Sequence, residues 1–337
     1  MSGRTEPESW RRMVLHSQPL PAWLSPDAPQ SDVVLSTRVR FMRNLAEHRF
    51  PNSAGRKELE EIEGSVLSAL TSAFAGGEVF RRISQAEREY LLVCRLVSPD
   101  LEWNLPGRAL WVDQAREIAV MVNEEDHVRL QALTPGWSIT RADDLARDAL
   151  EILGQSLNWA YSPGLGFLSA SPTNVGAGRR HSAMLHLIGL GQMRRLPAVL
   201  EALSVKRLTA RGLFGESSRA IGAFVQVSMV NGDRAEFNGA IEYLMTNERE
   251  ARAAMGAELV RKKVSDAVTM IRAASSLSMA DALRAIGWLR LAAGLGESLW
   301  TERKIDALFP QLEVRLHASE MSAAKHRADV LRQVVEG

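Results

Sequence analysis

Three strand-like runs follow one another in the first half of the chain with very short connections. The runs cover residues 109–113, 118–123 and 127–133, and only a few residues separate each run from the next. A parallel crossover needs about a dozen residues or more, so strands this close together must pair antiparallel. We therefore expect a mostly antiparallel sheet rather than repeated βαβ units.

Other segments show the same two periodicities. Apolar residues recur at helical spacing in two segments, and apolar residues form short strand-like runs in several others. Helices are expected at residues 53–75 and 141–160, and further strands at residues 31–40, 90–97, 167–171, 181–187 and 222–230. The fold class is therefore α+β, a mostly antiparallel sheet flanked by helices.

The last third of the chain differs in composition. No proline occurs between Pro197 and Pro310, and Ala, Leu, Arg and Met dominate from about residue 235. Ser278 begins the run SMAD, an N-cap pattern with an acid three residues later. We expect two domains, residues 1–246 with the sheet and residues 247–337 all-helical. The second has more apolar positions than one small domain needs, so we expect it to form a homodimer.

Composition excludes several classes of protein. Forty-one basic residues against forty acidic ones give a net charge of +1, so no global field favours nucleic acid or a membrane surface. No apolar stretch approaches the roughly 20 residues of a membrane span, and the N-terminus lacks the apolar core of a signal peptide. The single cysteine, Cys94, lies in the apolar run YLLVCRLV and is expected to be a buried thiol. We expect a soluble cytoplasmic protein.

Several common catalytic motifs are missing. The sequence contains no GxxxxGK[ST], GxGxxG, HRD or DFG element, and no GxSxG. It also lacks paired CxxC and HExxH patterns, so neither a structural nor a catalytic zinc site is expected. The usual nucleotide-binding folds are therefore not supported.

Arginines stand beside several of the expected strands. Alternate residues of a strand face the same side, so Arg38 and Arg40 of STRVR can face one ligand. Guanidinium groups from several loops would form a cage of fork-like donors for a polyphosphate. Taken singly, each arginine reads as a solvated surface residue. The candidates are Arg38, Arg40, Arg129, Arg179, Arg180 and Arg211.

Acidic residues follow one of the apolar strands. In VMVNEEDHVRL, residues 120–130, Glu124 and Glu125 come at the end of a run that reads as buried. Carboxylates in such a place are costly unless a cation meets them. Together with Glu216 of RGLFGE they would form the acidic half of a site whose other half is the arginine cage.

Four segments together resemble the ATP:guanido phosphotransferase superfamily, which includes creatine and arginine kinases. They are STRVRFMRNL, NEEDHVRLQ, SPTNVGAGRR and RGLFGESSRAIGAFVQVS, and the resemblance covers about residues 31–230. SVKRLTARGLFGE and MVNEEDHVRLQ look closest to the bacterial protein-arginine kinases. The helical tail is similar to the dimerisation domain of that group.

The resemblance implies roles for individual residues. Glu125 matches the carboxylate that binds the guanidinium and acts as base, and Glu216 matches its partner on a mobile loop. Mg²⁺ would accompany ATP, held mainly by the nucleotide phosphates. The arginines that match those holding the ATP phosphates are Arg38, Arg40, Arg129, Arg180 and Arg211.

The sequence departs from the family pattern in two places. Ser171 stands in SASPTNVG where the family usually has Cys, and it offers a neutral hydrogen bond to substrate in place of a thiolate. The tail of protein-arginine kinases commonly carries an RDxxRA motif that binds phosphoarginine. Here AAKHRA has Ala323 and Ala324 in place of Arg-Asp, so we expect that regulation to be absent.

Three functions remain open at this point. The first is a protein-arginine kinase, whose resembling group implies an activator protein and a Clp-type protease as partners. The second is a kinase of a small guanidino metabolite, and the third is a weakly active scaffold that retains the fold. STRVR begins at Ser36, which leaves too few residues before it for the helical domain that closes over small guanidines in resembling kinases. That favours arginine side chains on proteins as substrates.

Overall fold

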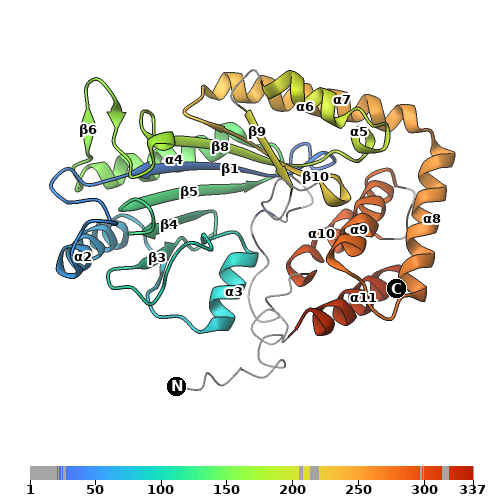
Figure 1. Ribbon diagram of the computed structural model, residues 1–337, viewed down its shortest axis with the longest axis horizontal. Helices are drawn as coiled ribbons and strands as arrows, with labels where there is room; N and C mark the ends of the chain where they lie inside the picture. Colours follow the sequence, from blue (N-terminus) through green and yellow to red (C-terminus); the bar gives the residue numbers. More distant parts are fainter. Residues whose placement is uncertain are drawn as a thin grey trace.

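One large sheet organises the chain (Figure 1). The structure is a computed structural model that describes residues 21, 23, 25, 28–204, 208–212, 220–296, 298, 300–312 and 319–336. Eight strands pair in the order β2-β3-β4-β5-β1-β8-β10-β9, and each of these pairings is antiparallel. The strands are β1 (Val34–Arg43), β2 (Glu78–Phe80), β3 (Ala109–Val112), β4 (Ile118–Val122), β5 (Val128–Pro135), β8 (Arg179–His186), β9 (Leu208–Gly212) and β10 (Phe224–Val230). This confirms the expected antiparallel α+β class.

Helices and short elements complete the described chain. A separate hairpin consists of β6 (Tyr161–Ser162) and β7 (Gly166–Phe167), and short 3₁₀ turns are η1 (Pro172–Asn174), η2 (Ile221–Ala223) and η3 (Phe309–Leu312). The helices are α2 (Arg56–Ala73), α3 (Gln85–Val93), α4 (Ile139–Gly154), α5 (Ile188–Gln192), α6 (Leu196–Ser204), α7 (Arg234–Met255), α8 (Ala257–Ala273), α9 (Met279–Gly294), α10 (Glu302–Asp306) and α11 (Glu320–Glu336). No helix in the described ranges is long and apolar enough to cross a membrane.

The two faces of the sheet have different chemistry. On one face, alternate residues such as Val39, Leu130 and Val227 join the largest apolar core, which helices α2, α4 and α7 cover. The other face carries Arg38 and Arg40, and we call it the arginine face. Alternation along antiparallel strands produces this division, because every second side chain points the same way.

The arginine face is covered by apolar packing at both ends. At the β3–β4 end, Leu110 and Met121 pack under α3 in a cluster that includes Leu91. At the β10 end, Phe224 and Met184 pack with buried residues of α9 and α11. The polar part of the face includes the arginines of β5, β1 and β8, and that of β9, the edge strand beyond β10.

The sequence misassigned one element completely. Residues 90–97, expected to be a strand, form the end of α3 and the turn after it. Ser84 accepts a hydrogen bond from the Glu87 backbone N–H, and the Glu87 side chain accepts one from the Ser84 N–H. This capping box starts a helix whose apolar last turn resembles a buried strand in sequence. Cys94, which follows α3, is buried as expected, and burial raises the pKa of its thiol to about 12.

Other helices and strands begin or end at residues different from those expected. Only Phe167 of the expected strand 167–171 lies in a strand, and the helix expected at 141–160 ends at Gly154. The expected domain boundary between residues 246 and 247 falls inside α7, which continues to Met255 before Gly256 turns the chain into α8. The helical part also shares an apolar cluster with the sheet, so the division into two domains stays a prediction.

A buried arginine of α9 joins the helical part to the chain before β1. Arg290 is 1% exposed and binds Asp306 of α10 through Nε at 2.8 Å. Its Nη1 and Nη2 donate to the carbonyls of Asp32 and Ser31 at 3.1 and 2.6 Å. Since β1 begins at Val34, this guanidinium helps to fix the strand that carries Arg38 and Arg40.

We predict that Arg290→Ala lowers the free energy of unfolding by about 3–5 kcal/mol, because it leaves a carboxylate and two carbonyls without their buried partner. Chemical denaturation would measure this change. Arg284→Ala is the matched control on the same helix, since its pair with Asp281 is 61% and 48% exposed. The control should cost less than about 1 kcal/mol. Equal losses in the two variants would contradict the structural role of Arg290.

Candidate active site

The register of the sheet brings the five expected phosphate-binding arginines to one face. On β1, Arg38 and Arg40 point to the same side, and Arg40 lies directly opposite Arg180 of β8. Arg129 of β5 pairs with Met42, two residues beyond Arg40. Arg211 of the edge strand β9 pairs with Gln226 of β10, whose Oε1 accepts a hydrogen bond from Arg38 Nη2 at 3.3 Å.

These guanidinium groups repel one another. Burial lowers the pKa of Arg38 to about 9, and the charges of Arg129 and Arg180 contribute to the decrease. Burial and the charge of Arg38 hold the pKa of Arg40 well below its ordinary value, and burial and Arg211 lower that of Arg180. Cations held together at such a cost indicate a site for an anion with several charges.

Two buried nitrogen atoms point to the same conclusion. Arg40 is 7% exposed, and its Nε has no hydrogen-bond partner among the described residues. The Nε of Arg180 is also buried without a partner in that part of the chain. Buried donors are nearly always satisfied in proteins, so these two fit a bound ligand with acceptor oxygens.

Sequence reasoning missed a sixth arginine at this cage. Arg95 follows α3 with a φ of +61°, and its charge is the largest like-charge contribution to the lowered pKa of Arg38. Its guanidinium lies 4.8 Å from the ring centre of Trp23. Arg95 belongs to the run misassigned as a strand, so its direction could not be read from strand alternation.

The acidic loop between β4 and β5 is a tight turn closed by its first residue. Asn123 has a φ of +54°, and its N–H donates to the carbonyl of His127 at 3.0 Å. Its side-chain Nδ2 donates to the carbonyls of Leu59 and Gly107 at 2.9 and 2.7 Å. Asn123 therefore fixes the turn to α2 and to the segment before β3.

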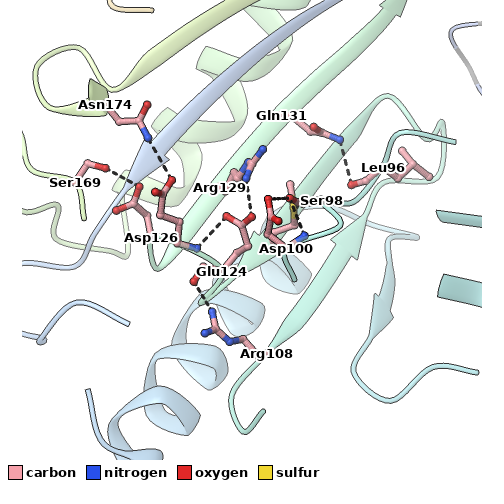
Figure 2. A network of polar contacts seen from close by, with 12 residues as sticks. Leu96, Ser98, Asp100, Arg108, Glu124, Asp126, Arg129, Gln131, Ser169 and Asn174 are labelled. Atoms are coloured by element: carbon pink, nitrogen blue, oxygen red, sulfur yellow. Dashed lines mark hydrogen bonds and ion pairs between the residues drawn. The ribbon is translucent and has the colours of Figure 1, made fainter. Parts of the chain in front are cut away.

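Two residues of this loop support its shape. The carboxylate of Asp126 accepts a hydrogen bond from Asn44 Nδ2 at 2.6 Å. It accepts another from Ser169 Oγ at 2.8 Å (Figure 2). His127 Nδ1 accepts from the Leu45 N–H at 3.0 Å, so the neutral tautomer carries its proton on Nε2 and can donate to the carbonyl of Arg49. Burial lowers the pKa of His127, which fits this neutral form.

Glu124 connects the acidic loop to the arginine cage. Its Oε1 accepts from Arg129 Nη1 at 2.7 Å, and its Oε2 accepts from the Glu125 N–H at 2.9 Å (Figure 2). Burial alone would raise the pKa of Glu124, but Arg129 and this N–H outweigh it, and the pKa lies below its ordinary value. The cation expected to meet the acidic residues of the loop is therefore Arg129.

Glu125 is the exposed carboxylate of the loop. Its Oε2 accepts a long hydrogen bond, 3.5 Å, from Nδ2 of Asn174. Burial raises the pKa of Glu125, and the charges of Asp126 and Glu124 raise it further. An exposed carboxylate with a raised pKa and acidic neighbours attracts a cation and accepts a proton readily.

The structure describes some of the remaining candidate residues. Ser171 is half-buried beside η1, and its Oγ lies 3.0 Å from the hydroxyl of Thr173. The Asn174 N–H donates to the Ser171 carbonyl at 2.9 Å, so Ser171 and the neighbour of Glu125 share one turn. Arg179 points to the opposite face of the sheet and donates to the carbonyl of Gly232. Glu216 lies outside the described residues.

Comparison with known proteins gives consistent matches. The family described as ATP:guanido phosphotransferase, C-terminal catalytic domain, matches residues 62–235, so Arg38 and Arg40 precede the matched segment. The chain is 35% identical over 298 residues to a protein-arginine kinase of Desulforamulus reducens, covering 83% of each chain. It is 32% identical over 345 residues to that of Moorella thermoacetica, covering 94% of this chain and 97% of the relative.

A solved structure agrees in fold. A lombricine kinase superposes with a TM-score of 0.61 at 21% identity, over 72% of this chain and 75% of that one. The family match spans the acidic loop, the turn with Ser171 and three of the five arginines. This chain therefore belongs to the ATP:guanido phosphotransferase family, as a kinase-fold enzyme similar to bacterial protein-arginine kinases.

Proposed function

We propose that the protein is a protein-arginine kinase that transfers the γ-phosphoryl group of ATP to arginine side chains of proteins. The observation that carries this proposal is the ion pair of Glu124 with Arg129, which joins an anion-binding cage to an exposed carboxylate one residue away. A phosphate donor and a guanidinium acceptor can then meet where the two halves join. The names of the relatives favour protein substrates.

In the proposed reaction, the arginine cage holds the triphosphate and neutralises the charge on the oxygens of the transferred group. Glu125 orients the planar guanidinium and accepts the proton that one of its nitrogens loses as the N–P bond forms. The bond between the γ-phosphorus and the bridging oxygen breaks, and ADP leaves with the electron pair. A guanidinium is a poor nucleophile while protonated, so the base is essential.

We propose that Mg²⁺ enters with ATP and is held mainly by the nucleotide phosphates. Bound there, it would neutralise part of the charge on the transferred group. The guanidinium groups that line the cage are donors only and offer no ligand to a metal cation. Among the described residues, no group of three or more His, Cys, Asp or Glu side chains is arranged to hold a metal.

The proposed protein partners extend this activity. We propose that the protein forms a homodimer through the helical part, is located in the cytoplasm, and has an activator protein and a Clp-type protease as partners. The grounds are the family resemblance and the sequence composition.

We also propose that regulation by phosphoarginine is absent. The burial of residues in AAKHRA supports this proposal. Ala323 is buried, and Arg327 is fully buried with Nη1 and Nη2 bound to Glu320 at 2.6 and 3.0 Å.

The choice of substrate is tested with two acceptors at equal guanidinium concentration. We predict a higher kcat/KM for an unfolded arginine-rich protein than for free arginine, because Glu125 is exposed and accessible to a side chain that is still attached to its backbone. Mass spectrometry under conditions that preserve acid-labile phosphoarginine would identify the product. Faster turnover of free arginine would favour the metabolite kinase, and no turnover of either would favour the scaffold.

We predict that Glu125→Gln lowers kcat about 10²–10⁴-fold, since the change is nearly isosteric but removes the base. The ATP affinity of the variant should stay close to that of the wild type. None of the cage arginines that the structure describes makes a hydrogen bond to the Glu125 side chain. The wild-type protein should lose activity in acid, because kcat/KM falls as Glu125 becomes protonated. Burial and neighbouring carboxylates raise the pKa of Glu125, so the midpoint of this fall should lie above the ordinary glutamate pKa. The Glu125→Gln variant should lose this pH dependence. Near-normal activity in the variant would remove Glu125 from the mechanism.

The dimer is tested with charged residues on the helical part. Met321 of α11 and Leu295 at the end of α9 are 70% and 52% exposed. We predict that Met321→Glu together with Leu295→Glu converts the protein to a monomer in multi-angle light scattering, because buried unpaired charges oppose association. Leu165→Glu on the β6–β7 hairpin is the matched control, at 62% exposure, and should stay dimeric. A dimer that persists in the double variant would place the interface elsewhere.

A further inference from the structure

A cavity lies directly beside the acidic loop. It has a volume of about 560 Å³ and is bounded by α2, residues 81–83 and residues 103–108. Its lining combines arginines and glutamates with apolar side chains.

The cavity and the acidic loop share one rigid wall. Arg108 lines the cavity, and its Nη1 donates to the backbone carbonyl of Glu124 (Figure 2). Asn123 holds Gly107, another lining residue, through the 2.7 Å hydrogen bond to its carbonyl. Gly107 has a φ of +68°, and a Cβ there would lie 2.5 Å from the Leu59 carbonyl oxygen, so this wall is packed tightly onto α2. A ligand in the cavity would therefore lie close to the backbone of the loop that carries Glu125.

The charge of the cavity is positive after internal pairing. Four arginines and two glutamates line it, but Arg56 binds Glu60 at 2.9 Å and Arg81 binds Glu63 at 2.5 Å. Arg82 and Arg108 make no ion pair within 4.0 Å with any carboxylate of the described residues. Two guanidinium groups are thus available to an anion.

The charged form of Arg108 is destabilised by its burial in this wall. Burial lowers its pKa, and the nearby charges of Glu102 and Glu124 offset the decrease only in part. Its Nε is buried without a hydrogen-bond partner in the described part of the chain. A carboxylate in the cavity would stabilise the charged form of Arg108, since opposite charges at close range favour each other.

The other walls are apolar. Trp103 is half-buried, Leu105 is 38% exposed, and Ile83 and Pro106 complete this side. A small inorganic anion would leave these surfaces in water. A carboxylate on a short aliphatic stem, attached to a peptide backbone, would cover them and meet the two guanidinium groups at once.

Building on the proposed function, we propose that this cavity binds an acidic side chain of the protein substrate, close in sequence to the arginine that is phosphorylated. The target guanidinium would lie at Glu125 while the neighbouring aspartate or glutamate lies at Arg82 and Arg108. The enzyme would then select arginines in mixed-charge segments over arginines in basic ones.

The test uses an unfolded carrier protein with a single arginine and with Glu, Gln or Lys at one position within about four residues on either side, a reach of about 13 Å in an extended chain. Phosphoarginine formation is measured as kcat/KM. At one or two positions, Glu should exceed Gln by about fivefold and Lys should fall below Gln, as for a partly exposed charge pair. Arg82→Glu should reverse the ranking, so that Lys exceeds Glu, because the variant exchanges the sign of one wall.

Arg272→Glu on α8 is the matched control, an exposed arginine outside the cavity, and should keep the wild-type ranking. A gain of activity toward the Lys carrier in Arg82→Glu cannot arise from misfolding, so the reversal is decisive. Equal rates for the three carriers, or an unchanged ranking in Arg82→Glu, would overturn the cavity assignment and leave the kinase activity in place. Absence of phosphoarginine on every carrier with the wild-type protein would overturn the proposed function, and the cavity assignment with it.

Discussion

The pairing of β1 with β5 and β8 is the constraint on which the site depends. This register places Arg40 opposite Arg180 and beside Arg129, so that like charges gather on a half-buried surface. The sheet tolerates the repulsion because its other face is continuous with the largest apolar core, and because apolar clusters cover both ends of the arginine face. Folding thereby builds a surface whose electrostatic cost a bound polyanion would lower.

Elements governed by local rules could be predicted from the sequence. The short connections among β3, β4 and β5 required antiparallel pairing, and alternation put Arg38 and Arg40 on one side, as the structure confirms. The convergence of Arg129, Arg180 and Arg211 was a hypothesis drawn from their positions beside strands, and the family resemblance implied it as well. The sheet register supports it through contacts that join residues far apart in the sequence, which a single sequence does not reveal.

The errors arose where a tertiary contact or a cap decides between two readings of the same residues. The apolar run ending at Val97 resembles a buried strand, but the capping box at Ser84 starts a helix, and the run then packs under the sheet instead of within it. Arg95 was lost with that error. The division into two domains at residue 246 rested on composition and stays a prediction, although the proposed boundary lies inside the continuous helix α7.

The four polar residues that follow Asn123 divide two opposing tasks among them. A base for a guanidinium must be exposed and unpaired, yet an exposed turn at the end of a buried strand must also be held rigidly. Asp126 and His127 supply the rigidity through hydrogen bonds to residues 44, 45 and 169. Glu124 neutralises Arg129, which leaves Glu125 without a cationic partner of its own in the described structure. In the proposed mechanism, Glu124, Asp126 and His127 therefore bear the structural cost of the turn so that Glu125 can react.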